Sequence, residues 1–243
     1  MSKKRFKKVL VVLGGNSGER SVSLQTGKAC INALKKKRYK VSTFDPKFKN
    51  LNLIDAKKTE VIFNALHGKD GEDGVAQSYF EYLRIPYTHS GIISSYNAMN
   101  KIISKELFLK NKILTPKYFS LGISNFKNKN LKKLLKNKKI SFPIVVKPIN
   151  EGSSLGVKIT KNFKELIRST KNLLKKYNEL IFEQYIGGQE IQAAVINGSS
   201  IGAIELIPKR SFYDYKAKYS KSAKTKHIMP ARLKKRNTKK YLK

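Results

Sequence analysis

Short apolar segments that end in glycine-rich loops set the strongest limit on the fold of this chain. Residues 8–13 (KVLVVL) have the branched, apolar character of a buried strand, and the loop at 14–18 (GGNSG) follows directly. A helix capped by Ser21 is predicted next, and further strands are predicted near 39–44 and 60–66. Strands that alternate with helices are typical of α/β folds. We therefore expect a doubly wound parallel sheet with helices on its faces.

The second half of the chain has a different pattern. A helix at 94–110 is predicted to lead into it. Its clearest turn, Asn197-Gly198, fits a two-residue hairpin loop. The tyrosine-rich segment 211–219 is predicted to be a loop. The other predicted elements are strands at 140–147, 180–183, 189–195 and 201–207, and a helix at 163–176 capped by Asn162.

The charge of the chain raises nucleic-acid binding as a competing class of function. Lys and Arg number 52 against 16 Asp and Glu, which gives a formal net charge of +36, and basic residues neutralise phosphates. Only eight of the 52 are Arg, the residue that reads bases through paired hydrogen bonds, and the lysines are dispersed. A compositional bias toward lysine on solvated faces is the simpler explanation. The alternative is an anionic partner or a nucleotide substrate.

Other features of the composition favour a cytoplasmic protein. An apolar fraction of 40% is enough for a packed core. The single cysteine, Cys30, cannot form an internal disulfide, which fits a reducing compartment. No apolar run approaches the ~18 residues that span a bilayer. We therefore expect a soluble cytoplasmic protein without a membrane segment.

Two strand ends in the first half carry candidate site residues. Glu19 follows the GGNSG loop, at the position where open α/β sheets place ligands. Its carboxylate could receive a substrate ammonium, and an ordinary strand-to-helix turn is the alternative. The loop is not G-x-G-x-x-G, so no dinucleotide site is predicted. His67 lies at the end of a later strand, although a lone histidine is more often a packed or surface residue.

Two segments of the second half suit a phosphate ligand. Lys147 precedes the loop at 151–156 (EGSSLG), whose amides could donate to a phosphate while the lysine supplies a charge. No Walker A pattern is present, and an ordinary hairpin turn fits this segment equally well. The segment 212–219 (FYDYKAKY) holds three tyrosines, which suit a lid, a surface for single-stranded nucleic acid, or a packed surface loop.

These segments, taken in their order along the chain, resemble the D-alanine–D-alanine ligase family of ATP-grasp enzymes. The similarity extends from Lys8 to about Pro230. A collinear match of this many motifs rarely arises by chance. The matching segments are 13–23 (LGGNSGERSVS), 65–68 (ALHG), 71–74 (GEDG), 86–91 (PYTHSG), 145–148 (VVKP), 151–156 and 212–219.

The resemblance implies an N-terminal parallel-sheet domain followed by an incomplete ATP-grasp α+β fold. It implies a substrate-binding domain at 1–95, a central ATP-grasp subdomain at 96–188 and the start of a C-terminal subdomain at 189–243. The implied reaction is the ATP-dependent ligation of two D-alanines to D-alanyl-D-alanine through an acyl phosphate, for peptidoglycan precursor synthesis. Members of the family commonly form homodimers.

The resemblance also implies roles for individual residues. Glu19 is expected to hold the ammonium of the first D-alanine. Ser153 and Tyr219 are expected to complete a hydrogen-bonded set with Glu19, which would fix the lid, segment 212–219, over the site. His67 is expected near the carboxylate of the same substrate. Three lysines are expected to neutralise the phosphates of ATP, namely Lys101, Lys147 and Lys218. Two carboxylates, Glu183 and Glu190, are expected to bind the adenine amino group and the ribose hydroxyls.

The sequence departs from the family pattern in three places. Asn100 stands where an Asp is usual, and His89 stands where a Gly is usual. After Asp214 the chain has no Asp or Glu, whereas the family holds two Mg²⁺ ions with acidic residues of its C-terminal part. We therefore predict no metal ligand in this chain and expect the chain as given to be a partial, inactive form.

Two alternatives to this function stay open. The nearer one is a D-alanine–D-lactate ligase or another ATP-grasp ligase, although Tyr219 in the lid favours the dipeptide product. The more distant one is a basic nucleic-acid-binding protein on a degenerate ATP-grasp scaffold. The low arginine content makes nucleic acid the less favoured partner.

Overall fold

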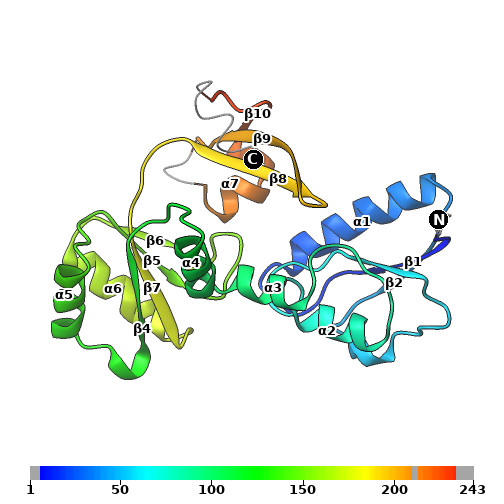
Figure 1. Ribbon diagram of the computed structural model, residues 1–243, viewed down its shortest axis with the longest axis horizontal. Helices are drawn as coiled ribbons and strands as arrows, with labels where there is room; N and C mark the ends of the chain where they lie inside the picture. The colour runs from blue at the N-terminus through cyan, green and yellow to red at the C-terminus, as the bar shows by residue number, and fades with distance from the viewer. Residues whose placement is uncertain (1–5, 210–212, 234–243) are drawn as a thin grey trace.

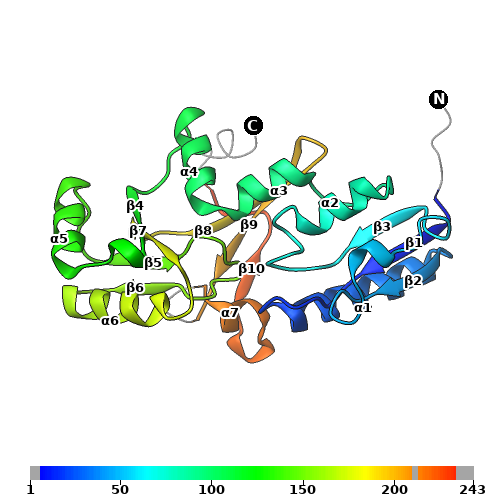
Figure 2. The ribbon, with the colours of Figure 1, turned by 90° about the horizontal axis from the view of Figure 1, so that it is seen from below.

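The computed structural model describes residues 6–209 and 213–233, which form three sheets surrounded by helices (Figure 1). The N-terminal sheet lies at one end of the molecule and the central sheet at the other. The third sheet lies over the region between them, as the two views in Figures 1 and 2 show. Within the described ranges no helix is long and apolar enough to cross a membrane.

The N-terminal sheet is parallel, as the sequence predicts. Its strands are β1 (Lys8–Val12), β2 (Lys40–Phe44) and β3 (Val61–Asn64), in the order β2-β1-β3. Alternate residues of β1 face opposite sides, so Val9 and Val11 pack toward α1 (Arg20–Lys36) while Leu10 and Val12 pack toward α2 (Val75–Tyr82). The expected doubly wound arrangement is therefore confirmed. The helix begins at Arg20, one residue before the predicted cap.

The predicted single helix at 94–110 is wrong, because the structure has two helices there. α3 (Ile92–Met99) ends before Asn100, and α4 (Lys101–Lys110) begins after it. Asn100 has an extended backbone, and its side-chain Oδ1 accepts hydrogen bonds from the amides of Ile102 (3.0 Å) and Ile103 (3.2 Å). An asparagine that satisfies the first free amides of a helix starts a new helix instead of continuing the old one.

The central sheet is antiparallel and has the order β4-β7-β5-β6. Two helices, α5 (Asn128–Asn137) and α6 (Phe163–Leu174), pack on it around a core that includes Leu131, Leu166 and Phe182. Asn162 caps α6, as predicted, by accepting from the amide of Glu165. The strands are β4 (Tyr118–Gly122), β5 (Ile144–Pro148), β6 (Lys158–Thr160) and β7 (Glu179–Gln184).

The third sheet contains the predicted hairpin. β8 (Glu190–Ile196) and β9 (Ser199–Ile207) pair antiparallel around Asn197-Gly198, where both residues have positive φ, and β10 (Lys226–Ile228) pairs with β9. The loop predicted at 211–219 is wrong in part, because Tyr215–Tyr219 form the short helix α7. Asp214 precedes this helix and its Oδ1 accepts from the amide of Ala217, a local bond that favours a helical turn. Ser211 and Phe212 lie outside the described residues.

Candidate active site

Glu19 lies at the centre of the candidate site. It occupies the position before α1, in the loop after β1, and it is 2% exposed. A Cβ added to Gly68 or Gly152 would lie 2.6 or 2.5 Å from the carboxylate oxygen Oε2, so both loops need glycine to approach it. Among the described residues Oε2 is buried and has no hydrogen-bond partner. A buried acceptor without a partner is the feature expected of a site that receives a ligand donor.

Ser153 connects Glu19 to Tyr219 at the end of α7. Its hydroxyl donates to Glu19 Oε1, and its oxygen lies 2.5 Å from the hydroxyl of Tyr219. The adjacent hydroxyl of Ser154 donates to the carbonyl of Tyr213 (2.9 Å). Loops from the N-terminal and central sheets therefore meet α7 at one place, and Glu19, Ser153 and Tyr219 form one hydrogen-bonded set. Burial at this junction raises the pKa of Tyr219, which keeps its hydroxyl protonated.

Two of the three predicted phosphate lysines lie at the start of α4 and the end of β5. Lys101 Nζ donates to the carbonyls of Glu151 (2.5 Å) and Ile149 (3.3 Å). Burial, and then the nearby charge of Lys147, lower the pKa of Lys101 to about 8. Lys147 Nζ lies 2.5 Å from Glu183 Oε2. These side chains gather positive charge beside the EGSSLG loop that begins at Glu151.

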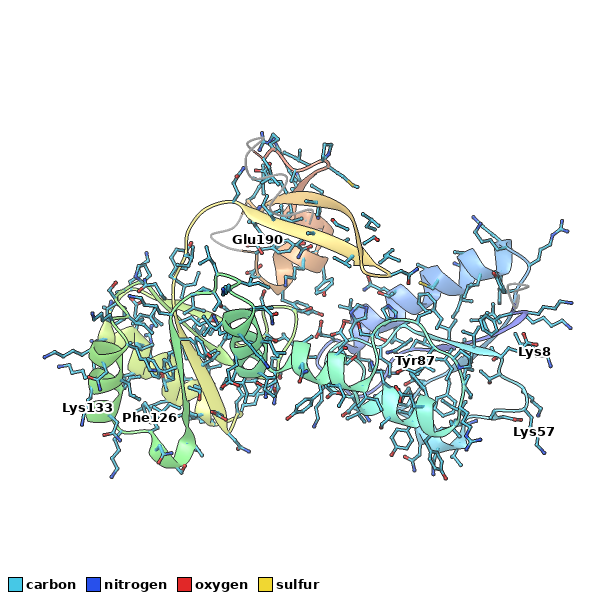
Figure 3. The ribbon with its side chains drawn as sticks, in the orientation of Figure 1. Lys8, Lys57, Tyr87, Phe126, Lys133 and Glu190 are labelled. Atoms are coloured by element: carbon cyan, nitrogen blue, oxygen red, sulfur yellow. The ribbon has the colours of Figure 1, made fainter. Side chains whose placement is uncertain are left out.

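Lys218 and Glu190 approach from the third sheet. Lys218 lies on α7, with its Nζ 5.3 Å from the ring centre of Tyr213, and burial lowers the pKa of this lysine. The carboxylate of Glu190 opposes that decrease, so the two charges are near each other. Glu190 begins β8 and lies on the side of this sheet that faces the rest of the molecule, far from Lys133 on α5 (Figure 3).

Glu183, which the resemblance assigns to adenine, is not an exposed side chain in the structure. The side chain is buried on β7, and its two carboxylate oxygens contact Lys105 Nζ (2.8 Å) and Lys147 Nζ (2.5 Å). Burial raises the pKa of Glu183, but the two lysines outweigh it and hold that pKa below its usual value. The carboxylate is therefore the centre of an ion cluster.

His67 lies next to the Glu19 loop and lines a cavity of about 420 Å³. Its Nε2 is 3.1 Å from the hydroxyl of Thr26 on α1, and its Nδ1 is 3.7 Å from a carboxylate oxygen of Glu72. Gly68, the next residue in the chain, is one of the two glycines against Glu19. His67 is thus within the same loop cluster as Glu19 and Ser153, although no direct contact joins it to Glu19 among the described residues.

Comparison with known proteins decides the family. Residues 107–243 match the family described as the D-ala D-ala ligase C-terminus. The chain is 53% identical over 233 residues to a D-alanine–D-alanine ligase of Pelagibacter ubique (strain HTCC1062), a match that covers 95% of this chain and 75% of that protein. The chain belongs to the D-alanine–D-alanine ligase family. The resemblance found in the sequence is confirmed.

Solved structures agree with this assignment. The crystal structure of D-alanine–D-alanine ligase from Bacillus anthracis is 35% identical and has a TM-score of 0.81, covering 96% of this chain and 74% of that one. A structure of the same enzyme complexed with ATP is 31% identical and has a TM-score of 0.75, covering 94% and 72%. The expected α/β fold, a parallel-sheet domain followed by ATP-grasp elements, is therefore confirmed.

Sequence reasoning missed two residues that organise the site. Lys105 lies one helical turn after Lys101 on α4. The sequence does not distinguish a buried lysine in a helix from the solvent-exposed lysines that are far more common. Arg20 pairs with Asp45 (2.8 Å) and donates to the carbonyl of Gly15 (2.9 Å), which fixes the loop before Glu19. The sequence indicates a role for Arg20 in the site only through its position directly after Glu19.

The Mg²⁺ ions typical of the family do not fit the described residues. In 6–209 and 213–233 no group of three or more His, Cys, Asp or Glu side chains lies together in a way that could hold a metal ion. Mg²⁺ prefers several oxygen ligands, usually including carboxylates. No step of the mechanism is therefore assigned to a metal here.

Proposed function

We propose that this chain binds D-alanine and ATP and serves the ATP-dependent ligation of two D-alanines through an acyl phosphate. The observation that carries the proposal is the hydrogen-bonded set of Glu19, Ser153 and Tyr219, in which three distant segments meet at a buried carboxylate. The names of the related proteins support the reaction and the substrate, and the ATP complex of the Bacillus anthracis ligase supports the nucleotide.

Glu19 would bind the ammonium of the first D-alanine. Its Oε2 is the buried acceptor without a partner, while Oε1 already accepts from Ser153. An ammonium group supplies donors and a positive charge, both of which a buried carboxylate requires. His67, from the adjacent loop, would lie near the substrate carboxylate. The Ser153–Tyr219 contact would hold the lid closed and keep water from the acyl phosphate.

The lysines would neutralise the phosphates of ATP. Phosphorylation brings an anionic carboxylate to an anionic triphosphate, so the barrier falls when fixed positive charges surround the reacting atoms. Lys101 and Lys147 lie beside the EGSSLG loop, and Lys218 reaches in from α7. Glu190 would bind a ribose hydroxyl. The contact of Glu183 with adenine stays a prediction, because both of its oxygens already contact lysines.

Several wider features belong to the same proposal. The three sheets fall one each within residues 1–95, 96–188 and 189–243, which supports the predicted division into a substrate domain and two ATP-grasp subdomains. We infer a cytoplasmic homodimer that serves peptidoglycan precursor synthesis, with Mg²⁺ as a cofactor of the reaction whose ligands are not among the described residues.

Calorimetric titration of the purified chain with D-alanine and with ATP tests the proposal. Both should bind, and Glu19→Gln should weaken D-alanine binding about tenfold or more, because a charge-assisted contact is worth ~1.5–3 kcal/mol. The matched control is Glu106→Gln, an exposed glutamate on α4, with no change expected. Absence of binding for both ligands would contradict the proposal.

A second assay addresses the reaction itself. Phosphate release with D-alanine, ATP and Mg²⁺ tests the expectation from the sequence that the chain as given is inactive. If phosphate is released, replacing the second D-alanine by D-lactate separates the dipeptide reaction from the depsipeptide alternative. Binding of a mixed oligonucleotide that is unaffected by ATP and falls steeply with salt would favour the nucleic-acid alternative.

A further inference from the structure

The geometry points to Lys105 as a positioning residue that holds the carboxylate of Glu183 and thereby leaves the ammonium of Lys147 available to a nucleotide phosphate. This inference rests on the proposed ATP binding. Lys105 itself is not expected to touch the nucleotide. It would act through Glu183, which it contacts on the side opposite to Lys147.

Lys105 has every donor of its ammonium occupied. The three contacts of Nζ are with Glu183 Oε1 (2.8 Å), the hydroxyl of Thr115 (2.7 Å) and the carbonyl of Pro116 (3.2 Å). An ammonium has three N–H groups, so this side chain has nothing left to offer a ligand. The residue is 5% exposed, and its Nζ lies 4.9 Å from the ring centre of Tyr118. Such a fully bonded, buried lysine is part of the scaffold.

Lys147 has the opposite character. Its side chain is 22% exposed, and Glu183 Oε2 is its one ion-pair partner among the described residues. Two of its three N–H groups are therefore available for a ligand. Lys147 is the last residue but one of β5, close to the EGSSLG loop and beside Lys101. Of the two lysines on Glu183, it is the one that faces the proposed phosphates.

Lys105 determines how strongly Glu183 competes for Lys147. With both lysines present the cluster has one negative and two positive charges, so a net positive charge remains for the ligand. Without Lys105 the buried carboxylate would have Lys147 as its one direct ion-pair partner among the described residues. Removing one partner of a buried ion cluster leaves part of a charge uncompensated. The carboxylate of Glu183 would then interact more strongly with the partner that remains, Lys147. Lys147 would be neutralised inside the protein instead of by ATP.

The test compares ATP binding by calorimetry in Lys105→Met and in Lys110→Met, an exposed lysine at the end of the same helix. Lys105→Met should weaken ATP binding about ten- to a hundredfold, the loss expected for one charge-assisted contact, whereas Lys110→Met should match the wild type. Lys105→Arg should restore most of the affinity. Wild-type affinity in Lys105→Met would overturn the inference.

A second pair of variants separates positioning from a general structural effect. In the background of Glu183→Gln there is no carboxylate to compete, so adding Lys105→Met should change ATP affinity less than twofold. A large further loss in the double variant would overturn the inference. This comparison also holds if Lys105→Met alone does not fold, because the double variant buries no unpaired charge. In the single variant Glu183→Gln the ammonium of Lys105 keeps its bonds to Thr115 and Pro116.

The pH dependence gives an independent readout. Without Lys105 the carboxylate of Glu183 loses a counter-charge and protonates more easily. The ATP affinity of Lys105→Met, compared with that of the wild type at the same pH, should therefore recover as the pH falls from 7 to 5. A merely structural defect would not recover. Failure of the wild type to bind ATP would instead reject the proposed function, so the two failures are distinguishable.

Discussion

The hydroxyl of Ser153 donates a hydrogen bond to the carboxylate of Glu19, 134 residues earlier in the chain. The same oxygen contacts the hydroxyl of Tyr219 on α7, 66 residues later. One serine therefore joins loops of the N-terminal and central sheets to the helix α7, which follows the first two strands of the third sheet. Because the Ser153 hydroxyl gives its one proton to Glu19, its oxygen accepts from the hydroxyl of Tyr219. The proposed closure of α7 over the site therefore depends on the carboxylate that we propose to bind the substrate.

This arrangement predicts a coupling between Ser153 and Tyr219. Ser153→Ala and Tyr219→Phe should each weaken D-alanine binding by about 0.5–1.5 kcal/mol, the usual net worth of one hydrogen bond. Because Tyr219 acts through Ser153, the double variant should lose little more than Ser153→Ala alone. The measurement is a double-mutant cycle of D-alanine affinities. Strictly additive losses would mean that the contact does not hold the lid.

A second prediction concerns Lys147. Lys147→Met should weaken ATP binding by ~1.5–3 kcal/mol, because it removes a charged donor from a partly buried site. Lys136→Met, an exposed lysine on α5, should change the affinity by less than about 0.5 kcal/mol. Both affinities can be measured by calorimetry with the same ATP stock. Equal effects would show that Lys147 is an ordinary surface charge.

The break between α3 and α4 gives a third prediction. Asn100→Ala removes the side-chain oxygen that accepts from the amides of Ile102 and Ile103. The loss should be about 1 kcal/mol, or about 2–4 °C in the melting temperature of a chain of this size. Asn100→Asp keeps an acceptor at the cap and should melt within about 1 °C of the wild type. A melting temperature for Asn100→Ala equal to the wild type would show that the cap contributes nothing.

The sequence predicted those parts of the fold that depend on local patterns. The apolar strand at residues 8–13, the glycine turns and the Asn197-Gly198 hairpin each follow from neighbouring residues. The helix break at Asn100 was missed because one polar residue does not disturb a helical repeat, whereas its side-chain bonds to the next amides do. The helix α7 was missed because tyrosine-rich segments have no strong helical periodicity.

The candidate site depends on contacts that no local pattern contains. Glu19 and Ser153 were paired by resemblance to a family, since periodicity cannot relate loops so far apart in the chain. The resemblance did not indicate that Glu183 would be shared by Lys105 and Lys147. That arrangement needs α4 to lie against β7, a tertiary contact that depends on packing of the whole central sheet.

The last prediction concerns the charge of Lys101 and its effect on ATP binding. Burial and the charge of Lys147 lower the pKa of Lys101 to about 8, while Glu183 and Glu151 act in the opposite direction. ATP phosphates near Lys101 would raise this pKa, because they favour the charged form. Above pH 8 the free protein has lost a proton that the complex regains. ATP affinity should therefore fall as the pH rises from 8 to 9.5, by at most tenfold per pH unit.

Calorimetry in two buffers with different ionisation enthalpies measures this proton directly. Wild-type protein should take up a fraction of a proton per ATP at pH 9, and much less at pH 7, where Lys101 is already charged. The terminal phosphate of ATP is fully ionised at pH 9, and at pH 7 it contributes equally in the wild type and in Lys101→Arg. Lys101→Arg keeps its charge throughout this range, so it should take up fewer protons than the wild type at pH 9 and the same number at pH 7. An equal uptake at pH 9 in wild type and Lys101→Arg would place the titrating group elsewhere.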